Sequence, residues 1–199
     1  ARILIDCGLF QGSKTERELN YGPFPFKPAD VDAVILTHAH IDHSGLLPKL
    51  VKHGFSGPIH ATPATIDLCS VMLPDAAHIQ EFEVEQLNRR NLKRGRPEVT
   101  PIYTMADAEA CLKLCQPQGY SDWINVAAGM RARFWNAGHL LGSASVELEV
   151  AADAAGALRF HNVAPGTYAI AVLHDENDNG RADRALSAHG TSFAALAER

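Results

Sequence analysis

Three histidines and one aspartate directly follow a short apolar run. The run covers residues 31–36, and the polar residues after it are His38, His40, Asp42 and His43. A short apolar run followed by an amphipathic stretch predicts a buried strand and then a helix. The four polar residues would then occupy the turn at the carboxyl end of the strand, where open α/β sheets place their sites. This pattern favours an α/β fold.

The four polar side chains are candidate metal ligands, since zinc prefers imidazole nitrogens and carboxylate oxygens. Residues two apart point the same way in an extended turn. We therefore expect His38 and His40 to hold one metal, with Asp42 and His43 facing a second position beside it. A single histidine near a strand end usually has only a structural role. Crowded imidazoles gain nothing without a metal and repel each other when protonated, so a metal explains the cluster better.

Apolar periodicity and breaker residues predict the remaining elements. The prolines of segment 22–28 argue against regular structure there. Thr62 or Thr65 could cap the helix predicted over 64–71, and Asp75 could cap the longer helix predicted over 73–94. The predicted helices cover 45–53, 64–71, 73–94 and 106–115, and the predicted strands cover 2–7, 31–36, 58–61, 120–126, 130–135 and 146–150.

Length and charge limit the possible functions. The chain has 199 residues, enough for one domain or for one domain and a fragment of another. Its net charge of −5 creates no overall basic field, so nucleic-acid binding would depend on a local patch. A dense basic cluster either contacts nucleic-acid phosphates or is a solvated surface that the helix dipole favours. It consists of Arg89, Arg90, Lys93, Arg94 and Arg96.

Cysteine spacing and hydropathy indicate a cellular setting. Cys7, Cys69, Cys111 and Cys115 form no C-x-x-C pair, which favours buried thiols in a reducing cytoplasm over a disulfide framework. No apolar run approaches the ~18–20 residues that span a bilayer, and no signal peptide is visible. We expect a cytoplasmic protein without a membrane partner. The chain begins in a predicted strand and without Met, which suggests an N-terminal truncation.

Four stretches of the sequence resemble one protein family. T-H-A-H-I-D-H-S-G-L-L-P resembles the H-x-H-x-D-H signature of the metallo-β-lactamase fold. I-L-I-D-C-G-L-F-Q-G, L-P-D-A-A-H-I-Q-E and N-A-G-H-L-L-G-S-A-S-V resemble its RNA-processing branch, the β-CASP nucleases related to bacterial RNase J and the eukaryotic mRNA 3′-end endonuclease. The resemblance covers about residues 1–158. It implies a partial αβ/βα four-layer fold, incomplete at both ends, with one or two zinc ions and RNA as substrate.

The resemblance also implies roles for single residues. His139 would be the third ligand of the first metal, beside His38 and His40, and Asp6 would support the ligands from behind. The implied reaction is hydrolysis of phosphodiester bonds by a metal-activated hydroxide. Asp42 could orient or deprotonate the attacking water. The same ligands would also serve hydrolysis of another ester, such as a thioester or a lactone.

One expected residue of the family pattern is missing. The family has a Ser-Gly-Asp turn whose Asp bridges both metals, about twenty residues after the equivalent of His139. Residues 157–163 read A-L-R-F-H-N-V and contain no Asp. The later family histidine that completes the second site is not evident either. The second site is therefore expected to be incomplete, and a catalytically impaired remnant is the alternative to an active enzyme.

The end of the chain resembles a different family. Residues 159–184 resemble a small exported β-sandwich family of unknown function, so we expect residues 159–199 to be a β-rich segment of separate origin. Residues 175–183 also have the oxygen spacing of a calcium loop, but Leu186 stands where such a loop has Glu. A polar β-turn explains the segment better than calcium. The four candidate calcium ligands are Asp175, Asn177, Asn179 and Asp183.

Two isolated histidines have less specific surroundings. His60 lies in a predicted strand, and we expect a structural role for it. His78 lies near the start of the predicted helix 73–94, in a stretch that the family resemblance puts near the active-site cleft. It could contact substrate or be an ordinary surface residue.

Overall fold

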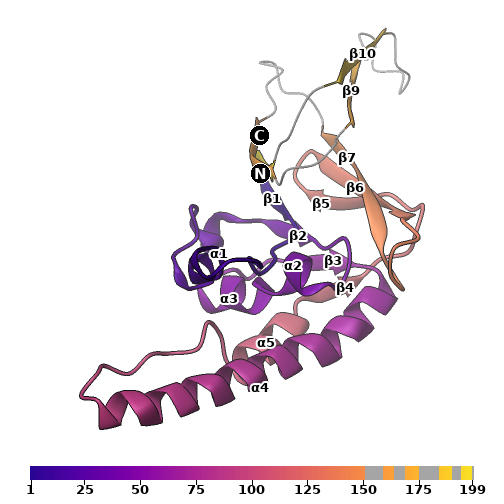
Figure 1. Ribbon diagram of the computed structural model, residues 1–199. Helices are drawn as coiled ribbons and strands as arrows, with labels where there is room; N and C mark the ends of the chain where they lie inside the picture. The colour runs from indigo at the N-terminus through magenta and orange to yellow at the C-terminus, as the bar shows by residue number, and fades with distance from the viewer. Residues whose placement is uncertain (151–158, 164–168, 175–183, 190–193, 199) are drawn as a thin grey trace.

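The computed structural model describes residues 1–150, 159–163, 169–174, 184–189 and 194–198. In this part of the chain, helices gather on one side of a mixed sheet, and a second sheet packs against the other side (Figure 1). The α/β class expected from the sequence is confirmed.

The first sheet carries the parallel strands that lead to the site. Four strands, in the order β4-β3-β2-β1, pair in parallel. β11 (Ala194–Glu198) pairs antiparallel with β1 and with β8 (Arg159–Val163). The four parallel strands are β1 (Arg2–Ile5), β2 (Ala33–Ile35), β3 (Ile59–Ala61) and β4 (Cys115–Pro117).

Both faces of this sheet are buried. Along β2, Val34 faces the helices, whereas Ala33 and Ile35 face the second sheet. Successive side chains of a strand point to opposite faces, so an uninterrupted apolar run suits a strand covered on both sides. The apolar run 31–36 therefore has a physical reason.

The second sheet is an antiparallel meander. It consists of β5 (Ile124–Ala127), β6 (Met130–Asn136) and β7 (Ala144–Val150). Phe134 of β6 is fully buried in a cluster that includes Ile3 of the first sheet. In the C-terminal segment, β9 (Ala169–His174) pairs antiparallel with β10 (Arg184–His189), as expected for a β-rich segment.

The helical layer differs from the expectation at its longest element. One helix, α4 (Pro63–Lys93), replaces the two helices expected over 64–71 and 73–94. Pro74 lies inside it and removes a backbone hydrogen bond, at a cost of about 3 kcal/mol. Burial of Leu73 and Ala77 in the core offsets this cost. Thr62 caps the helix, whereas Asp75 lies in its interior and caps nothing.

The other helices are short. α1 (Lys14–Glu18) was not expected, but Ser13 and Glu16 form a capping box that begins it. α2 (Ile41–Ser44) and α3 (Leu47–Lys52) follow the metal motif. α5 (Met105–Leu112) ends earlier than expected, and the chain continues into β4. Two 3₁₀ turns cover Leu19–Tyr21 and Pro28–Asp30.

Although α4 has 31 residues, no helix in the described part of the chain is both long and apolar enough to cross a membrane.

Candidate metal centre

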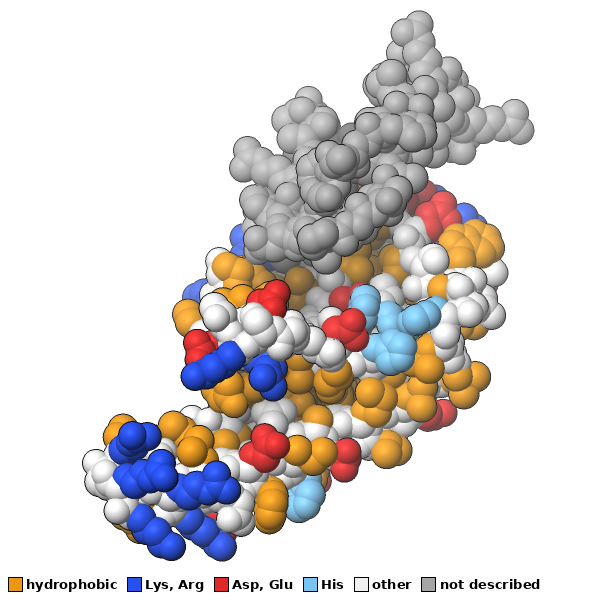
Figure 2. Space-filling view, viewed as in Figure 1, with side chains coloured by type: hydrophobic (Ala, Val, Ile, Leu, Met, Phe, Trp, Pro, Cys, Tyr) orange, Lys and Arg blue, Asp and Glu red, His pale blue; other side chains and the backbone are white. Residues whose placement is uncertain are grey.

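Three histidines from two loops converge beside the parallel sheet. His38 and His40 follow β2, and His139 lies on the loop between β6 and β7. His38 Nε2 lies 3.1 Å from His40 Nδ1, which lies 3.3 Å from His139 Nε2. Figure 2 shows histidine side chains gathered on one face of the molecule.

The donor set of this group fits a metal ion. One ring nitrogen of each histidine lies within 4.8 Å of the other two. A ring proton could bridge these nitrogens only in part, whereas a cation would satisfy all three lone pairs at once. Three imidazoles are also a ligand set that zinc accepts.

A hydrogen-bond relay orients His38. Thr37 Oγ1 lies 2.8 Å from Asp6 Oδ2 and 2.9 Å from His38 Nδ1. If the hydroxyl donates to the carboxylate, it accepts the Nδ1 proton of His38, which leaves Nε2 free for a metal. Burial, and then the proximity of His43, lowers the pKa of His38. A neutral imidazole is the form that binds metal.

Asp42 and His43 lie beside each other at the edge of this group. Asp6 Oδ2 accepts from His43 Nδ1 at 2.7 Å, and this hydrogen bond raises the pKa of His43. His43 Nε2 then faces Asp42 Oδ2 at 3.8 Å. Both residues belong to helix α2 and not to an extended turn, so the expected backbone was wrong, although the two side chains are adjacent as expected.

Close backbone contacts hold the loop after β1 against the segment that carries Asp42 and His43. Cys7 N donates to the carbonyl of His43 at 2.7 Å. A Cβ atom on Gly8 would lie 1.6 Å from the carbonyl oxygen of Asp42, so only glycine fits there. Asp6 itself adopts a φ of 59°, a conformation that Asp and Asn tolerate better than other side chains.

Two threonines at the start of α4 anchor the loop that carries His139. The hydroxyls of Thr62 and Thr65 donate to the carbonyl of Gly142 at 2.6 and 3.0 Å. Ser143 Oγ accepts from the backbone N–H of His139 at 3.0 Å. Thr37, Thr65 and Ser143 were not predicted as site residues, because isolated hydroxyls carry no recognisable spacing.

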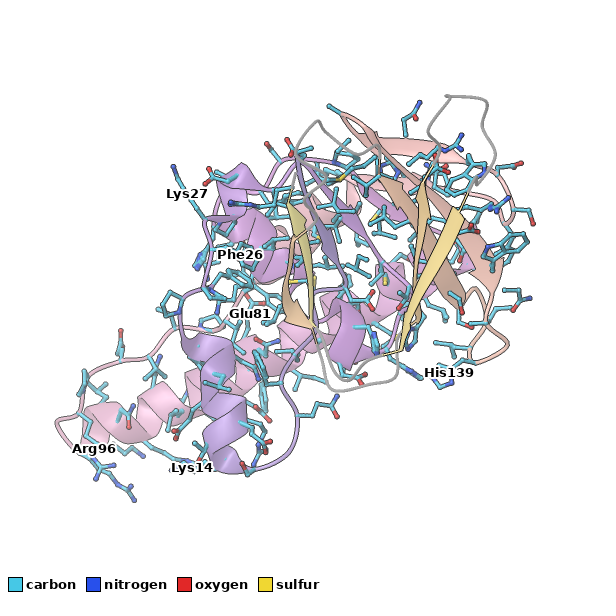
Figure 3. All side chains as sticks on the ribbon, turned by 90° about the horizontal axis from the view of Figure 1, so that it is seen from above. Lys14, Phe26, Lys27, Glu81, Arg96 and His139 are labelled. Atoms are coloured by element: carbon cyan, nitrogen blue, oxygen red, sulfur yellow. The ribbon has the colours of Figure 1, made fainter. Side chains whose placement is uncertain are left out.

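The other candidates lie apart from this centre. His60 is buried in β3, where its Nδ1 lies 3.1 Å from Gln118 Nε2, and His78 is exposed on α4. The basic cluster is exposed at the end of α4, and Figure 3 shows its Arg96 far from His139. All four candidate calcium ligands lie outside the described residues. Leu186, which stands where a calcium loop has Glu, falls in β10.

Comparison with known proteins identifies the family. Residues 1–66 match the family model of the metallo-beta-lactamase superfamily. Ribonuclease TTHA0252 of Thermus thermophilus is 40% identical over 145 residues, which are 73% of this chain and 29% of that protein. Transcription termination factor FttA of Methanococcus maripaludis is 32% identical over 151 residues, 75% of this chain and 22% of that protein. Residues 1–66 therefore belong to the metallo-β-lactamase superfamily.

These relatives confirm the resemblance to RNA-processing members of the superfamily, and the partial fold is confirmed with it. The chain spans less than a third of the length of either relative. A second family model, an uncharacterized protein conserved in bacteria (DUF2141), matches residues 135–192 and overlaps the junction expected after residue 158.

Solved metallo-β-lactamase structures are similar to part of this chain. A metallo-β-lactamase HARLDQ-motif mutant from Cronobacter sakazakii aligns over 73% of this chain and 46% of its own, with a TM-score of 0.42 and 18% identity. MEM-A1, a subclass B3 metallo-β-lactamase from a soil metagenome library, aligns over 72% and 46%, with a TM-score of 0.42 and 19% identity.

Proposed function

We propose that this chain is the metal-binding part of a zinc-dependent hydrolase of the β-CASP branch that cleaves phosphodiester bonds in RNA. The convergence of His38, His40 and His139 supports this most strongly, because three metal-competent nitrogens meet from loops about 100 residues apart in the chain. The 40% identity to a ribonuclease supports RNA as the substrate.

Each site residue has a proposed task. His38 Nε2, His40 Nδ1 and His139 Nε2 would hold the first zinc, and Asp42 and His43 would begin a second position. Zinc held there would supply Lewis acidity toward water and phosphoryl oxygens. The half-exposed Asp42 carboxylate can accept a hydrogen bond from a neighbouring water and so orient it for attack, or take its proton. Asp6 keeps the Nδ1 proton of His43 in place, so that Nε2 faces Asp42.

A second candidate follows from the missing bridging aspartate. Because residues 157–163 contain no Asp, the chain could hold a single zinc and hydrolyse RNA slowly or not at all. Hydrolysis of a thioester or a lactone uses the same ligands and remains the alternative chemistry. The free, largely buried thiols support a reducing, cytoplasmic setting for either function.

The test is RNA cleavage by the zinc-loaded chain. We expect cleavage of a labelled single-stranded RNA that stops on chelation and is lost in His38→Ala and in His139→Ala. His78→Ala removes an exposed histidine of α4 outside the site and should cleave like the unaltered chain. Cleavage that survives His139→Ala would contradict the proposed site, and zinc binding without cleavage of RNA would favour the impaired alternative.

A further inference from the structure

A cavity of about 610 Å³ lies between the segment 9–21 and the middle of α4. Ile41 forms part of its wall, and this residue stands between His40 and Asp42 of the metal centre. The cavity is therefore separate from the histidine group but begins next to it. Its volume is in the range of pockets that hold small organic ligands.

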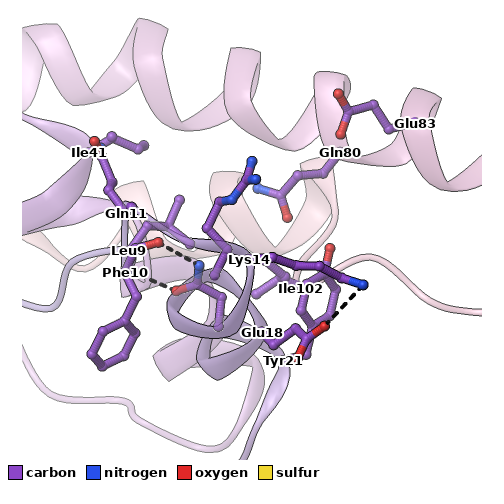
Figure 4. Close-up of a pocket in the computed structure, with 13 residues that line it drawn as sticks. Leu9, Phe10, Gln11, Lys14, Glu18, Tyr21, Ile41, Gln80, Glu83 and Ile102 are labelled. Carbon is purple, nitrogen blue, oxygen red and sulfur yellow. Dashed lines mark hydrogen bonds and ion pairs between the residues drawn. The ribbon is translucent and has the colours of Figure 1, made fainter.

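The chemistry of the lining is that of a surface that binds unpaired nucleotides. Phe10 and Tyr21 line it and are 50% and 63% exposed. In Figure 4, these two residues lie apart from each other among the lining side chains. Half-exposed aromatic rings are stacking surfaces for any nucleobase. Gln80 also lines the cavity, and a side-chain amide can donate to and accept from the edge of a base.

The charges of the lining are balanced. Two cations, Lys14 and Arg17, and two anions, Glu18 and Glu83, line the cavity. Lys14 pairs with Glu18 at 3.8 Å, but both side chains are exposed, so this pair is weak. Balanced charge favours an uncharged base inside the cavity, with phosphates at its rim near Arg17, and does not favour a polyanionic ligand throughout.

The wall of the cavity is built in advance. The buried side chain of Asn20 bonds the backbone of Phe10 twice, accepting from its N–H at 2.8 Å and donating to its carbonyl at 2.9 Å. The buried ammonium of Lys49 in turn donates to the carbonyl of Asn20 at 2.7 Å. A fixed wall lowers the entropy lost on binding.

The cavity also lies between the two other features that RNA would need. Along α4, Gln80 is about 20 Å from Thr65, which anchors the loop of His139, and about 20 Å from the basic cluster at Arg94. In Figure 3, Lys14 lies toward the same end of the molecule as Arg96, away from His139. A strand that occupied the cavity could therefore reach the metal centre at one end and the basic cluster at the other.

We propose that this cavity holds unpaired bases of an RNA strand and so presents a neighbouring phosphate to the histidine group. The proposal rests on the proposed function, because it assigns the cavity to the same substrate. It specifies that stacking on Phe10 and Tyr21 provides most of the affinity.

The test is the anisotropy of a fluorescein-labelled ten-nucleotide single-stranded RNA, measured in EDTA so that the RNA stays uncut. Loss of a stacking side chain weakens binding roughly 5- to 150-fold per base, and we expect the double variant Phe10→Ala, Tyr21→Ala, which loses two such side chains, to bind at least about 25-fold more weakly. Phe82→Ala removes another half-exposed phenylalanine, outside the lining, and should bind within twofold of the unaltered chain. Equal binding by the double variant, or no binding by the unaltered chain, overturns the proposal.

A second measurement covers the case in which the double variant does not fold. Photocrosslinking of 4-thiouridine RNA to the unaltered chain should map to residues 9–21, and crosslinks confined to other segments overturn the proposal. The cleavage assay separates this proposal from the proposed function. RNA that binds through Phe10 and Tyr21 but stays uncut in zinc contradicts the function alone, whereas cleavage with an unchanged KM in the double variant contradicts the cavity alone.

Discussion

Replacing Asp6 with Asn should disturb the hydrogen bonds of both Thr37 and His43, although the two side chains have nearly the same shape. Asp6 accepts three hydrogen bonds, from Thr37 N at 2.7 Å, from Thr37 Oγ1 at 2.8 Å and from His43 Nδ1 at 2.7 Å. Asn keeps one acceptor and tolerates the positive φ, but its amide nitrogen cannot accept from the other two groups. Loss of these two hydrogen bonds to a carboxylate, both partly exposed to solvent, should lower the free energy of unfolding by about 2–3 kcal/mol.

The larger effect should be on metal binding. With an amide at position 6, His43 is free to carry its proton on Nε2, and the Thr37 hydroxyl is free to donate to His38 Nδ1. Loss of such an orienting partner typically weakens metal affinity 10- to 100-fold. Competition with a chromophoric chelator measures the zinc affinity, and ¹⁵N NMR of the metal-free protein reports which nitrogen of His43 carries the proton.

The control for Asp6→Asn is Asp75→Asn, which makes the same charge change on the exposed surface of α4. Zinc affinity of Asp6→Asn within twofold of the unaltered chain, together with an unchanged His43 Nδ1 proton, would refute the orienting role of Asp6.

Three further predictions concern the loop anchor, the thiols and one surface carboxylate. Gly142→Ala should lower the free energy of unfolding by about 2 kcal/mol, measured in urea, because φ is +82° and the new Cβ would lie 2.6 Å from Thr65 N. Burial raises the pKa of Cys7 and of Cys69 to about 12, so both thiols should resist a disulfide reagent at pH 8 until the protein unfolds; rapid reaction of the native protein would contradict this. Hydrogen bonds from Trp135 and then Arg133 lower the pKa of Glu147, so the stability gained over Glu147→Gln should be present above pH 4.5 and vanish as the pH falls below it, as thermal unfolding across that range will reveal.

The local sequence pattern predicted the α/β class and strand β2, but it did not predict that the longest helix is continuous. The uninterrupted apolar run of β2 correctly predicted a buried strand, because both faces of this strand are covered. Pro74 misled the prediction of helix ends, since a proline usually breaks a helix. Burial of neighbouring side chains such as Leu73 in the core stabilises one continuous helix through Pro74. The core residues that cover Leu73 are distant in sequence, so the local pattern around Pro74 does not show them.

Some residues of the metal centre could likewise be predicted from the sequence, and others could not. His38 and His40 are neighbours in sequence, so their proximity could be predicted from spacing, whereas His139 depended on the family resemblance. The relay through Thr37 and the anchor formed by Thr62 and Thr65 could not be predicted, because single hydroxyls gain their role only from tertiary contacts. The helical backbone of Asp42 and His43 was missed because a four-residue helix has too little periodicity to recognise.

Zinc content per chain tests the central claim most directly. Elemental analysis after reconstitution and gel filtration should find at least one zinc in the unaltered chain and in His78→Ala. The double variant His38→Ala, His40→Ala should retain much less than one. Equal zinc in the double variant and the unaltered chain, or zinc in neither, would contradict a metal centre built on His38, His40 and His139.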